Sequence, residues 1–260
     1  MEIIIDLNKS VDENAGTYFE LAKKAKRKLE GAKDALEDSK KKLSQLQQQE
    51  NKFIAEEEKK QAQKEIKREW YEKFHWFISS EGFLCVGGKD ATSNEIIIKK
   101  HMEEKDLVFH TEMPGSPFFL IKNGKTAGET TLQETAQATA IYSKAWKAGL
   151  GSAQVFSILP EQVTKEAKAG EYMSKGSFMT YGKRSYYTVN LVCAIGLVES
   201  RVIGGPVEAI KKQTSSFVLV IPGGVKKSEL GKRIKHNLKG GDLDEIIKFL
   251  PGEGELKRQA

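Results

Sequence analysis

The sequence predicts an α+β protein in which a long antiparallel helical hairpin (coiled coil) is followed by a mixed α+β globular domain. Two observations predict it. Residues 20–70 are rich in charged side chains, contain no proline and have Gly31 as their one glycine, whereas from His75 onward glycines separate short β-branched and aromatic runs. In this second part strands outnumber helices without alternating strictly with them, which favours α+β over a doubly wound parallel sheet.

The first part of the predicted hairpin has a heptad spacing of apolar residues. This seam follows a 4-3-4-3 pattern with one polar member: Tyr18, Ala22, Ala25, Leu29, Ala32, Leu36, Ser39, Leu43 and Leu46. At about 1.5 Å per residue, a helix over this segment is roughly 42 Å long. The small alanines allow a second helix to approach closely, and whether two chains form a homodimer through this seam stays open.

The heptad phase fails at residues 47–52, and a second apolar series follows in another register: Ala55, Ala62, Ile66, Trp70 and Phe74. We therefore expect the chain to turn near residues 47–52 and to return as the second arm of a hairpin. One continuous helix with a register shift is the alternative. Large aromatic side chains at the end of the arm are expected to anchor it in the globular core: Trp70, Phe74, Trp76 and Phe77.

The second part of the chain is expected to contain short strands and four helices. The strands are expected at 75–79, 83–86, 106–110, 118–121, 153–158, 185–196, 199–203 and 216–221, and the helices near 91–102, 131–147, 226–239 and 242–249. The glycines at 87 and 88 permit a sharp strand-to-helix turn, and Asp90 has the position of an N-cap.

Composition narrows the function classes. The 260 residues carry 42 Lys and Arg against 36 Asp and Glu, a net charge of +6, which favours a polyanionic partner. The two cysteines, Cys85 and Cys193, lie in apolar runs and indicate reduced, buried thiols. We expect no cofactor and no metal site, and neither a signal peptide nor a membrane span, so the cytoplasm is the expected location.

Three stretches carry the candidate binding residues. The turn Gly87-Gly88-Lys89-Asp90, followed by Asn94, has the features of a phosphate cradle built from backbone N–H groups, or of a capped tight turn. His110 and Lys122 flank a Pro-Gly-Ser-Pro loop; binding to RNA, a structural histidine and catalysis are the three interpretations, although the rest of a catalytic constellation is missing.

A long basic connection, residues 163–187, interleaves cations with aromatic residues, as single-stranded RNA recognition requires. Its candidate contacts are Lys165, Lys175, Lys183 and Arg184. Residues 205–240 add eight Lys or Arg against two Glu, concentrated on one expected helix. That helix fits either phosphate binding or a solvated surface.

Ordered motifs across residues 1–184 resemble one known family. They include Trp70, Phe74, Trp76-Phe77, Gly87-Gly88, Asp90, Asn94-Glu95, Asp106, His110, Gly115, Lys122-Asn123, Thr131-Leu132, Ser143, Ala145-Trp146, Gln162-Val163, Lys165, Gly170-Glu171, Gly176-Ser177-Phe178 and Gly182-Lys183. This pattern resembles the NFACT-R domain of the NEMF/RqcH ribosome-associated quality control family, and residues 14–36 resemble the family's middle-domain coiled coil. The tail from residue 185 is similar to archaeal members.

The resemblance implies three regions: a coiled-coil arm at 1–74, an NFACT-R-like RNA-binding α+β domain at 75–184, and a β-rich extension with a basic helix at 185–260, packed on the same domain. It implies binding to large ribosomal subunits obstructed by peptidyl-tRNA, contact with rRNA and tRNA, and support of tRNA recruitment for C-terminal tailing. The family's N-terminal NFACT-N part is expected to be missing.

The chain departs from the family's pattern within the candidate site. Lys89 stands where many members have Arg, which removes a planar two-pronged donor. Thr92-Ser93 stand where many have Gln-Gln, and Pro114 stands where many have His. We expect a binding protein and not an enzyme. An RNA-processing hydrolase that uses His110 and a coiled-coil scaffold that binds another protein are the alternatives.

Overall fold

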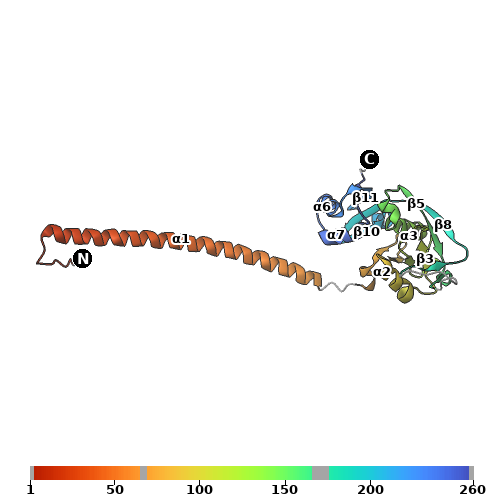
Figure 1. The fold of residues 1–260 in the computed structure, drawn as a ribbon, viewed down its shortest axis with the longest axis horizontal. Coiled ribbons are helices and arrows are strands. Elements are labelled where there is room, and N and C mark those ends of the chain that lie inside the picture. The colour runs from red at the N-terminus through yellow and green to blue at the C-terminus, as the bar shows by residue number, and fades with distance from the viewer. Residues whose placement is uncertain (1–2, 65–68, 166–175, 258–260) are drawn as a thin grey trace. The chain divides into compact units, whose positions relative to one another are not determined.

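The computed structural model describes residues 3–64, 69–165 and 176–257. The chain divides into two compact units, Met1–Arg68 and Glu69–Ala260, and each has its own internal contacts. The first unit contains the helix α1, Val11–Lys64, and the second contains every described strand (Figure 1). The α+β class predicted from the sequence is therefore confirmed.

Helix α1 begins at a capping box. The backbone N–H of Ser10 donates to the Glu13 carboxylate at 2.8 Å, and the N–H of Glu13 donates to the Ser10 hydroxyl at 3.2 Å. These bonds lower the pKa of Glu13. The preceding residues fold back onto the helix, because the Tyr18 hydroxyl donates to the Ile4 carbonyl at 2.7 Å.

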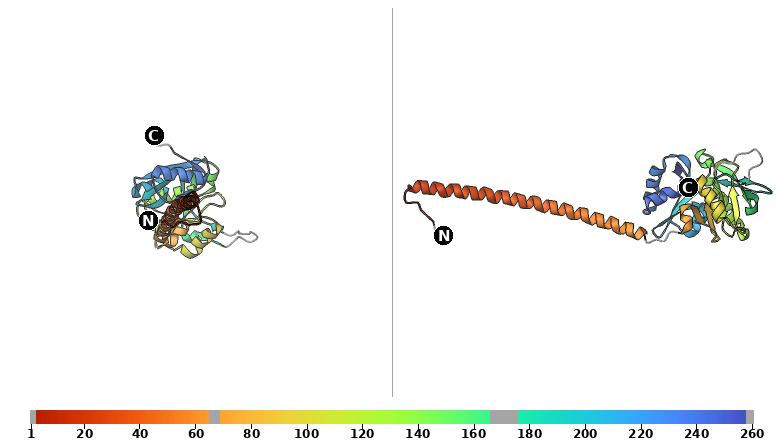
Figure 2. Two further views of the ribbon diagram at one scale, coloured as in Figure 1. Left: turned by 90° about the vertical axis from the view of Figure 1, so that its left-hand side faces the viewer. Right: turned by 60° about the horizontal axis from the view of Figure 1, so that its bottom comes forward.

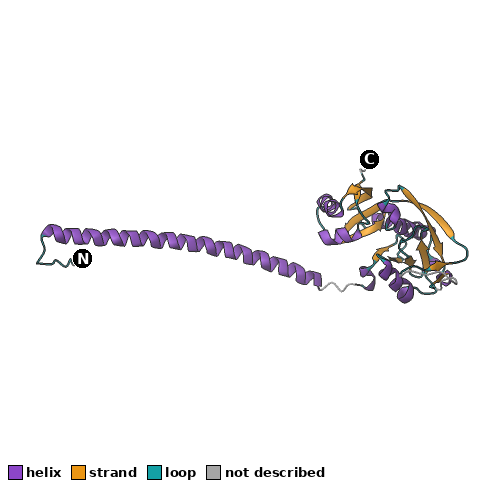
Figure 3. Cartoon of the chain, viewed as in Figure 1, coloured by secondary structure: helices purple, strands orange, loops and turns teal. Residues whose placement is uncertain are grey.

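The hairpin predicted near residues 47–52 is wrong, because α1 runs through them as one helix of 54 residues (Figure 3). This corresponds to about 81 Å of helix. The sequence QQQENK interrupts the apolar stripe without a Gly or Pro, and a change of stripe phase removes no backbone hydrogen bond. The alternative of a continuous helix is the one that the structure adopts.

The heptad seam of α1 has no cover among the described residues of the first unit. Leu29, Leu36 and Leu43 lie seven residues apart, and each is more than half exposed. A coiled-coil seam is stable when a second helix fills the spaces between its side chains. The seam therefore keeps its capacity to pair with another helix.

The second unit contains a six-stranded antiparallel sheet in the order β1-β2-β4-β3-β5-β8. Its strands are β1 His75–Ile78, β2 Leu84–Gly87, β3 Leu107–His110, β4 Phe119–Ile121, β5 Ser152–Ile158 and β8 Ser185–Asn190. A four-stranded antiparallel sheet has the order β10-β9-β11-β12. It is formed by β9 Cys193–Val198, β10 Arg201–Pro206, β11 Phe217–Val225 and β12 Gly254–Leu256.

Short helices and a small hairpin complete this unit. The helices are α2 Ala91–Ile96, α3 Glu129–Ile141, α4 Lys144–Lys147, α5 Val207–Gln213, α6 Lys227–Leu238 and α7 Leu243–Phe249. A π-helical turn, Ile97–His101, extends α2, and 3₁₀ turns lie at Trp70–Lys73, Gly124–Thr126 and Pro160–Gln162. Strands β6 Val163–Thr164 and β7 Met179–Thr180 pair with each other.

Helix α3 packs between the two sheets. It contacts β3, β4, β5 and β8 of the larger sheet and β10 of the smaller one. Its buried residues include Ala136, Ala138 and Ala140, whose small side chains allow both sheets to approach the helix closely. One hydrophobic core then runs from Phe77 to Leu250 and includes residues of both sheets.

The C-terminal elements gather on one side of this unit, where α6, α7 and β11 lie next to one another (Figures 1 and 2). Helix α7 packs on β10 and on α6, and α6 packs on β11. Their buried apolar residues Leu230, Ile234 and Ile246 belong to the shared core. The described elements beyond residue 192 thus share a hydrophobic core with the larger sheet and α3.

Most strands and helices expected in the second part of the chain form within a few residues of their expected bounds. The single strand expected at 185–196 is wrong. It is two strands, β8 and β9, in different sheets, and the chain crosses between them at Leu191 and Val192. The single helix expected at 131–147 is two helices, α3 and α4, because Ser143 leaves the helical path and caps α4. Helix α5 and strands β6, β7 and β12 were not expected.

The predicted arm anchors lie in the second unit. Phe74 and Phe77 are buried, while Trp70 stacks on His101 at 4.2 Å between ring centroids. Trp70 begins a 3₁₀ turn and is not the end of a second arm. How these residues connect to α1 depends on residues 65–68, which lie outside the described residues, so the anchoring role stays a prediction.

The cysteines are buried and free, as expected. Burial raises the pKa of both thiols to about 12. Over residues 3–64, 69–165 and 176–257, no helix is long and apolar enough to cross a membrane.

Candidate nucleic-acid interface

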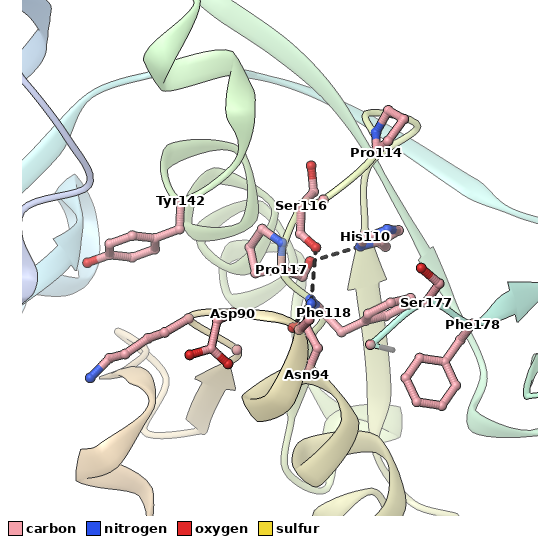
Figure 4. A pocket seen from close by; sticks show the side chains of 15 residues that line it. Asp90, Asn94, His110, Pro114, Ser116, Pro117, Phe118, Tyr142, Ser177 and Phe178 are labelled. Atoms are coloured by element: carbon pink, nitrogen blue, oxygen red, sulfur yellow. Dashed lines mark hydrogen bonds between the residues drawn. The ribbon is translucent and has the colours of Figure 1, made fainter. Parts of the chain in front are cut away.

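A pocket of about 400 Å³ lies where the start of α2, the loop 111–118 and residues 176–178 meet (Figure 4). We call it the turn–loop pocket. Its lining residues come from four places in the sequence: Gly88-Lys89-Asp90-Ala91 and Asn94, His110 and Pro114–Phe118, Tyr142, and Gly176-Ser177-Phe178. Two of the three candidate stretches contribute several lining residues, and the long basic connection contributes three.

The turn between β2 and α2 requires its two glycines. A Cβ on Gly87 would lie 2.2 Å from the Phe119 ring, and one on Gly88 would lie 2.0 Å from the Asn94 side-chain oxygen. Asp90 caps α2 by accepting from the Ser93 N–H at 2.8 Å. The backbone therefore passes close to the loop, and the close approach leaves no room for a side chain.

The N–H groups of this turn do not form a phosphate cradle, which was one of the two interpretations of the turn. The Gly88 N–H donates to the Phe118 carbonyl at 3.1 Å, and the N–H groups of Lys89 and Asp90 both donate to the Ser93 hydroxyl at 2.8 Å. Because these donors already have acceptors within the protein, the capped-turn interpretation fits the backbone. The charge that the turn offers to a ligand is the Lys89 ammonium group.

Asn94 fixes the loop and is itself buried. Its side-chain oxygen accepts from the Phe118 N–H at 3.1 Å, and its amide nitrogen donates to the Ser116 carbonyl at 3.3 Å. Both ends of the amide are thus occupied by the loop (Figure 4). The geometry favours a positioning role for Asn94.

His110 is held by the same loop. Its ring stacks on Phe118 with centroids 3.9 Å apart and an interplanar angle of 2°, and Nδ1 donates to the Pro117 carbonyl at 2.9 Å. A carbonyl can only accept, so Nδ1 carries a proton. Burial lowers the pKa of His110, which favours the neutral ring with a free Nε2 lone pair.

Two candidate cations lie over aromatic rings beside the pocket. Lys165 pairs with Glu95 and lies 5.8 Å from the Phe178 ring centroid. Arg184 pairs with Glu112 and lies 4.4 Å from the Phe156 ring centroid.

Ring contacts connect these cations to the pocket. Phe178 contacts Phe118 edge to face, and Phe156 contacts His110 in the same way. The structure thus brings Lys165 and Arg184 to the pocket through one continuous set of rings.

The remaining candidates have different surroundings. Lys183 is exposed, and no carboxylate among the described residues lies within ion-pair distance of it. Lys122 lies elsewhere: its ammonium group contacts the buried Asp106 carboxylate at 2.6 Å and the His101 carbonyl at 2.7 Å. Lys175 lies outside the described residues.

Sequence reasoning missed two residues at this site. Tyr142, at the end of α3, lines the pocket, stacks on His75 at 3.7 Å and donates its hydroxyl to the Phe249 carbonyl at 2.9 Å. Lys144 lies over the loop, because a Cβ on Gly115 would be 3.0 Å from its Cε. Neither residue has a local sequence signal, since only the packing of α3 and α4 brings them to the loop.

Comparison with known proteins identifies the segment that carries the pocket. Residues 73–182 match the family described as NFACT protein RNA binding domain. The archaeal Rqc2 homolog aRqcH of Methanocaldococcus jannaschii is 38% identical over 204 residues, which cover 75% of this chain and 30% of that protein.

Two further relatives match shorter parts. The ribosome quality control complex subunit NEMF homolog of Drosophila melanogaster is 35% identical over 184 residues, covering 70% of this chain and 18% of that protein. The chain thus spans less than a third of the length of either relative. The C-terminal part of a fibronectin/fibrinogen-binding protein from Streptococcus suis aligns with a TM-score of 0.39 and 21% identity, covering 48% of this chain and 50% of that one.

Proposed function

The chain belongs, over the part that its relatives match, to the NEMF/RqcH family of ribosome quality control proteins, and from this premise we propose that it is an RNA- and ribosome-binding module of such a factor. The observation that carries the proposal is the turn–loop pocket, which lies within the matched segment and is bordered by rings and cations. Aromatic faces that stack on bases and cations that contact phosphates are what unpaired RNA requires.

We assign two kinds of role to the candidate residues. Lys89 and Lys183 contact phosphates directly, because no carboxylate among the described residues pairs with either of them. Asn94 and His110 hold the loop in place. Asp90 caps α2 and sets the direction of the turn.

The finer function is binding to large ribosomal subunits obstructed by peptidyl-tRNA, with contact to rRNA and support of tRNA recruitment for C-terminal tailing. In this proposal the chain contributes binding energy and geometry in the cytoplasm, and the ribosome performs the chemistry. The surroundings of His110 support a binding role over the hydrolase alternative, because its ring is half-buried, stacked on Phe118 and bonded to a backbone carbonyl.

We further propose that the exposed seam of α1 pairs with a second helix, either from another copy of this chain or from the family's NFACT-N-containing part. The leucines at positions 29, 36 and 43 support this, since each has an apolar surface that no described residue of the first unit covers. Sedimentation equilibrium of the chain alone distinguishes the two sources: a dimer supports self-pairing, and a monomer supports the other partner.

The test of the central proposal is cosedimentation of the full chain with purified large ribosomal subunits that carry or lack peptidyl-tRNA, over a salt series. Binding that prefers the obstructed subunits is expected. If six or more phosphates are contacted, affinity falls about 10³-fold or more between 50 and 200 mM salt. Equal binding to both subunits contradicts the finer function, and no binding in dilute buffer contradicts the RNA-binding module itself.

A further inference from the structure

A second and larger cavity, of about 1070 Å³, lies between α4 and the C-terminal elements. It is lined by Lys147 next to Trp146, by Pro222 and Gly223 of β11, by Lys226 and Lys227 at the start of α6, by Ile247 of α7 and by residues 251–253. We call it the lysine cleft. Its volume is at the upper end of the range for small-ligand pockets, about 300–1,000 Å³.

The floor of the lysine cleft is apolar and closed. Trp146 is 2% exposed, and its indole N–H donates to the Glu253 carbonyl at 2.7 Å. Since this polar atom already has its partner, the indole offers a ligand neither a free donor nor an open face for stacking. The side chains left to recognise a ligand by charge are the three lysines.

These lysines have no acidic partners. Among the described residues, no carboxylate lies within ion-pair distance of Lys147, Lys226 or Lys227. Glu253 is the one acidic residue in the described lining, and it is exposed. Three cations against one carboxylate leave the cleft with a positive field.

The lysines also act on one another. Burial, and next the charge of Lys147, lower the pKa of Lys227. Holding an ammonium group in partial burial beside another cation is unfavourable unless a counter-charge is near. An anion in the cleft removes this unfavourable term. The arrangement of the lysines therefore favours the binding of an anionic ligand.

The positive field extends from the lysine cleft to the turn–loop pocket. Lys89, which lines the pocket, has its pKa lowered by burial and by the charges of Lys248 and Lys227. Burial, and then the charges of Lys89 and Lys227, lower the pKa of His75. Two of these cations, Lys89 and Lys147, come from the family-matched segment, and Lys226, Lys227 and Lys248 come from beyond it.

We propose that the lysine cleft binds the phosphate backbone of an RNA strand that continues from the turn–loop pocket past Lys89. This rests on the proposed RNA-binding function and extends it to residues 222–253, outside the segment that matches the RNA-binding family. The C-terminal extension thereby supplies part of the RNA-binding surface.

A polymeric ligand fits this arrangement better than a single small anion. Lysine is a point charge without the planar fork of arginine, so successive lysines follow a phosphate backbone without reading its sequence. The cleft offers charges for phosphates but no aromatic face for stacking bases, because Trp146 is buried. Bases are read in the turn–loop pocket, and the cleft contributes affinity.

The test uses the full chain, a labelled single-stranded RNA of roughly 20 nucleotides and a salt series. The variant combines Lys147→Gln, Lys226→Gln and Lys227→Gln. If three phosphates are lost, the slope of log affinity against log salt is expected to become shallower by about 2. The matched control, Lys212→Gln with Lys232→Gln and Lys235→Gln, removes the same charge from exposed positions outside the cleft lining.

The outcomes separate this inference from the function on which it rests. A wild-type chain that binds RNA, with a weakened cleft variant and an unaffected control, supports the inference. A cleft variant that binds like wild type, or a control that weakens equally, overturns it while RNA binding stands. A wild-type chain that binds neither this RNA nor ribosomal subunits overturns the proposed function.

Thermal unfolding tests whether the three lysines stabilise the fold instead of binding RNA. The midpoint of the cleft variant is expected to equal or exceed that of wild type, because mutual repulsion is removed. Weaker RNA binding together with a lower midpoint would mean that the lysines support the fold, and it would overturn the proposed binding site.

Discussion

Three of the candidate RNA-binding cations and the lysines of the lysine cleft differ in one respect, the presence of a carboxylate partner. Lys122, Lys165 and Arg184 pair with Asp106, Glu95 and Glu112, respectively. No carboxylate of the described residues pairs with the lysines of the cleft. Both sets come from the basic composition of the chain, yet their surroundings give them different uses.

This difference separates structural cations from ligand-binding ones. A phosphate that approaches a paired cation must compete with a carboxylate that is already in place, and a buried pair also holds its chain segments together. An unpaired cation keeps its full charge for a ligand and contributes little to the fold. Pairing therefore sorts the candidate residues in a way that residue type alone does not.

Replacing Lys122 is the strongest way to separate the two sets. Lys122→Met leaves the fully buried Asp106 without its ammonium partner, although two backbone N–H groups still reach it. We expect a loss of roughly 3 kcal/mol in the free energy of unfolding, measured in urea. RNA affinity of the folded protein should stay close to wild type.

Lys125→Met is the matched control for that experiment, because Lys125 is exposed three residues away and no ion pair with a described residue holds it. A change within about 0.5 kcal/mol is expected there. If Lys122→Met lowers RNA affinity strongly while stability is retained, Lys122 belongs with the ligand-binding cations and the separation is wrong.

Asn94→Ala is expected to have the next largest effect. It removes the acceptor of the Phe118 N–H and the donor to the Ser116 carbonyl, both in the buried part of the loop. An unpaired buried donor costs about 1–3 kcal/mol. RNA affinity should also fall, because the loop that positions His110 becomes less ordered.

The exposed Asn237→Ala is the control, since the hydrogen bond that its amide makes among the described residues goes to the Arg233 carbonyl on its own helix. Amide hydrogen exchange of residues 115–118 distinguishes positioning from direct contact. Faster exchange in the unliganded variant supports a positioning role for Asn94. Unchanged exchange with lost RNA affinity would instead make Asn94 a direct contact.

The sequence predicts local structure well where local signals decide it. Gly87, Gly88 and Asp90 predict the sharp turn and its cap, because glycines permit a tight strand-to-helix turn and Asp is a preferred N-cap residue. The charged run with a single glycine and no proline predicts a helix. The sequence does not predict which helix pairs with this one, because a heptad seam does not indicate whether the second helix comes from the same chain.

The sequence does not predict those contacts of the candidate site that depend on tertiary packing. The prediction of a phosphate cradle used the correct turn, but it could not foresee that Ser93 and Phe118 supply acceptors to its N–H groups. The lysine cleft joins Lys147 to residues about 80 positions later, and only the packing of α6 against β11 creates it.

Glu95→Gln tests whether a cation that loses its carboxylate partner begins to bind RNA. Side-chain bonds from Lys165 and then Lys99 lower the pKa of Glu95 to about 2, from an ordinary value of 4.5. The variant releases both lysines, so RNA affinity at low salt should rise several-fold, with a salt slope steeper by about 0.7 per added phosphate contact. Unchanged affinity would mean that pairing does not decide which cations bind RNA.

The same variant has a stability signature. Because the folded pKa of Glu95 is lowered, its stabilising contribution is full above pH 4.5 and is lost as the pH falls toward 2. Wild type should therefore lose its advantage over Glu95→Gln in this window, as measured by urea unfolding at successive pH values. A constant difference between the two proteins would show that the carboxylate charge is not involved.

The smallest expected effect concerns Lys227, where the linkage has the opposite sign. Burial and Lys147 lower its folded pKa below 10.5, so between the two pKa values the unfolded chain binds more protons than the folded one, and stability rises with pH. Lys227→Gln should be slightly more stable than wild type at pH 7, and this difference in stability should disappear as the pH approaches 10.5.

Two further variants serve as controls. Lys147→Gln removes the neighbouring charge that lowers the pKa of Lys227, so it should reduce the stability difference at pH 7. Lys235→Gln shows the effect of losing a charge elsewhere on the same helix. A stability difference that widens with pH would mean that Lys227 has a stabilising partner in the folded chain, and the cleft would then lack the unbalanced charge that an RNA backbone requires.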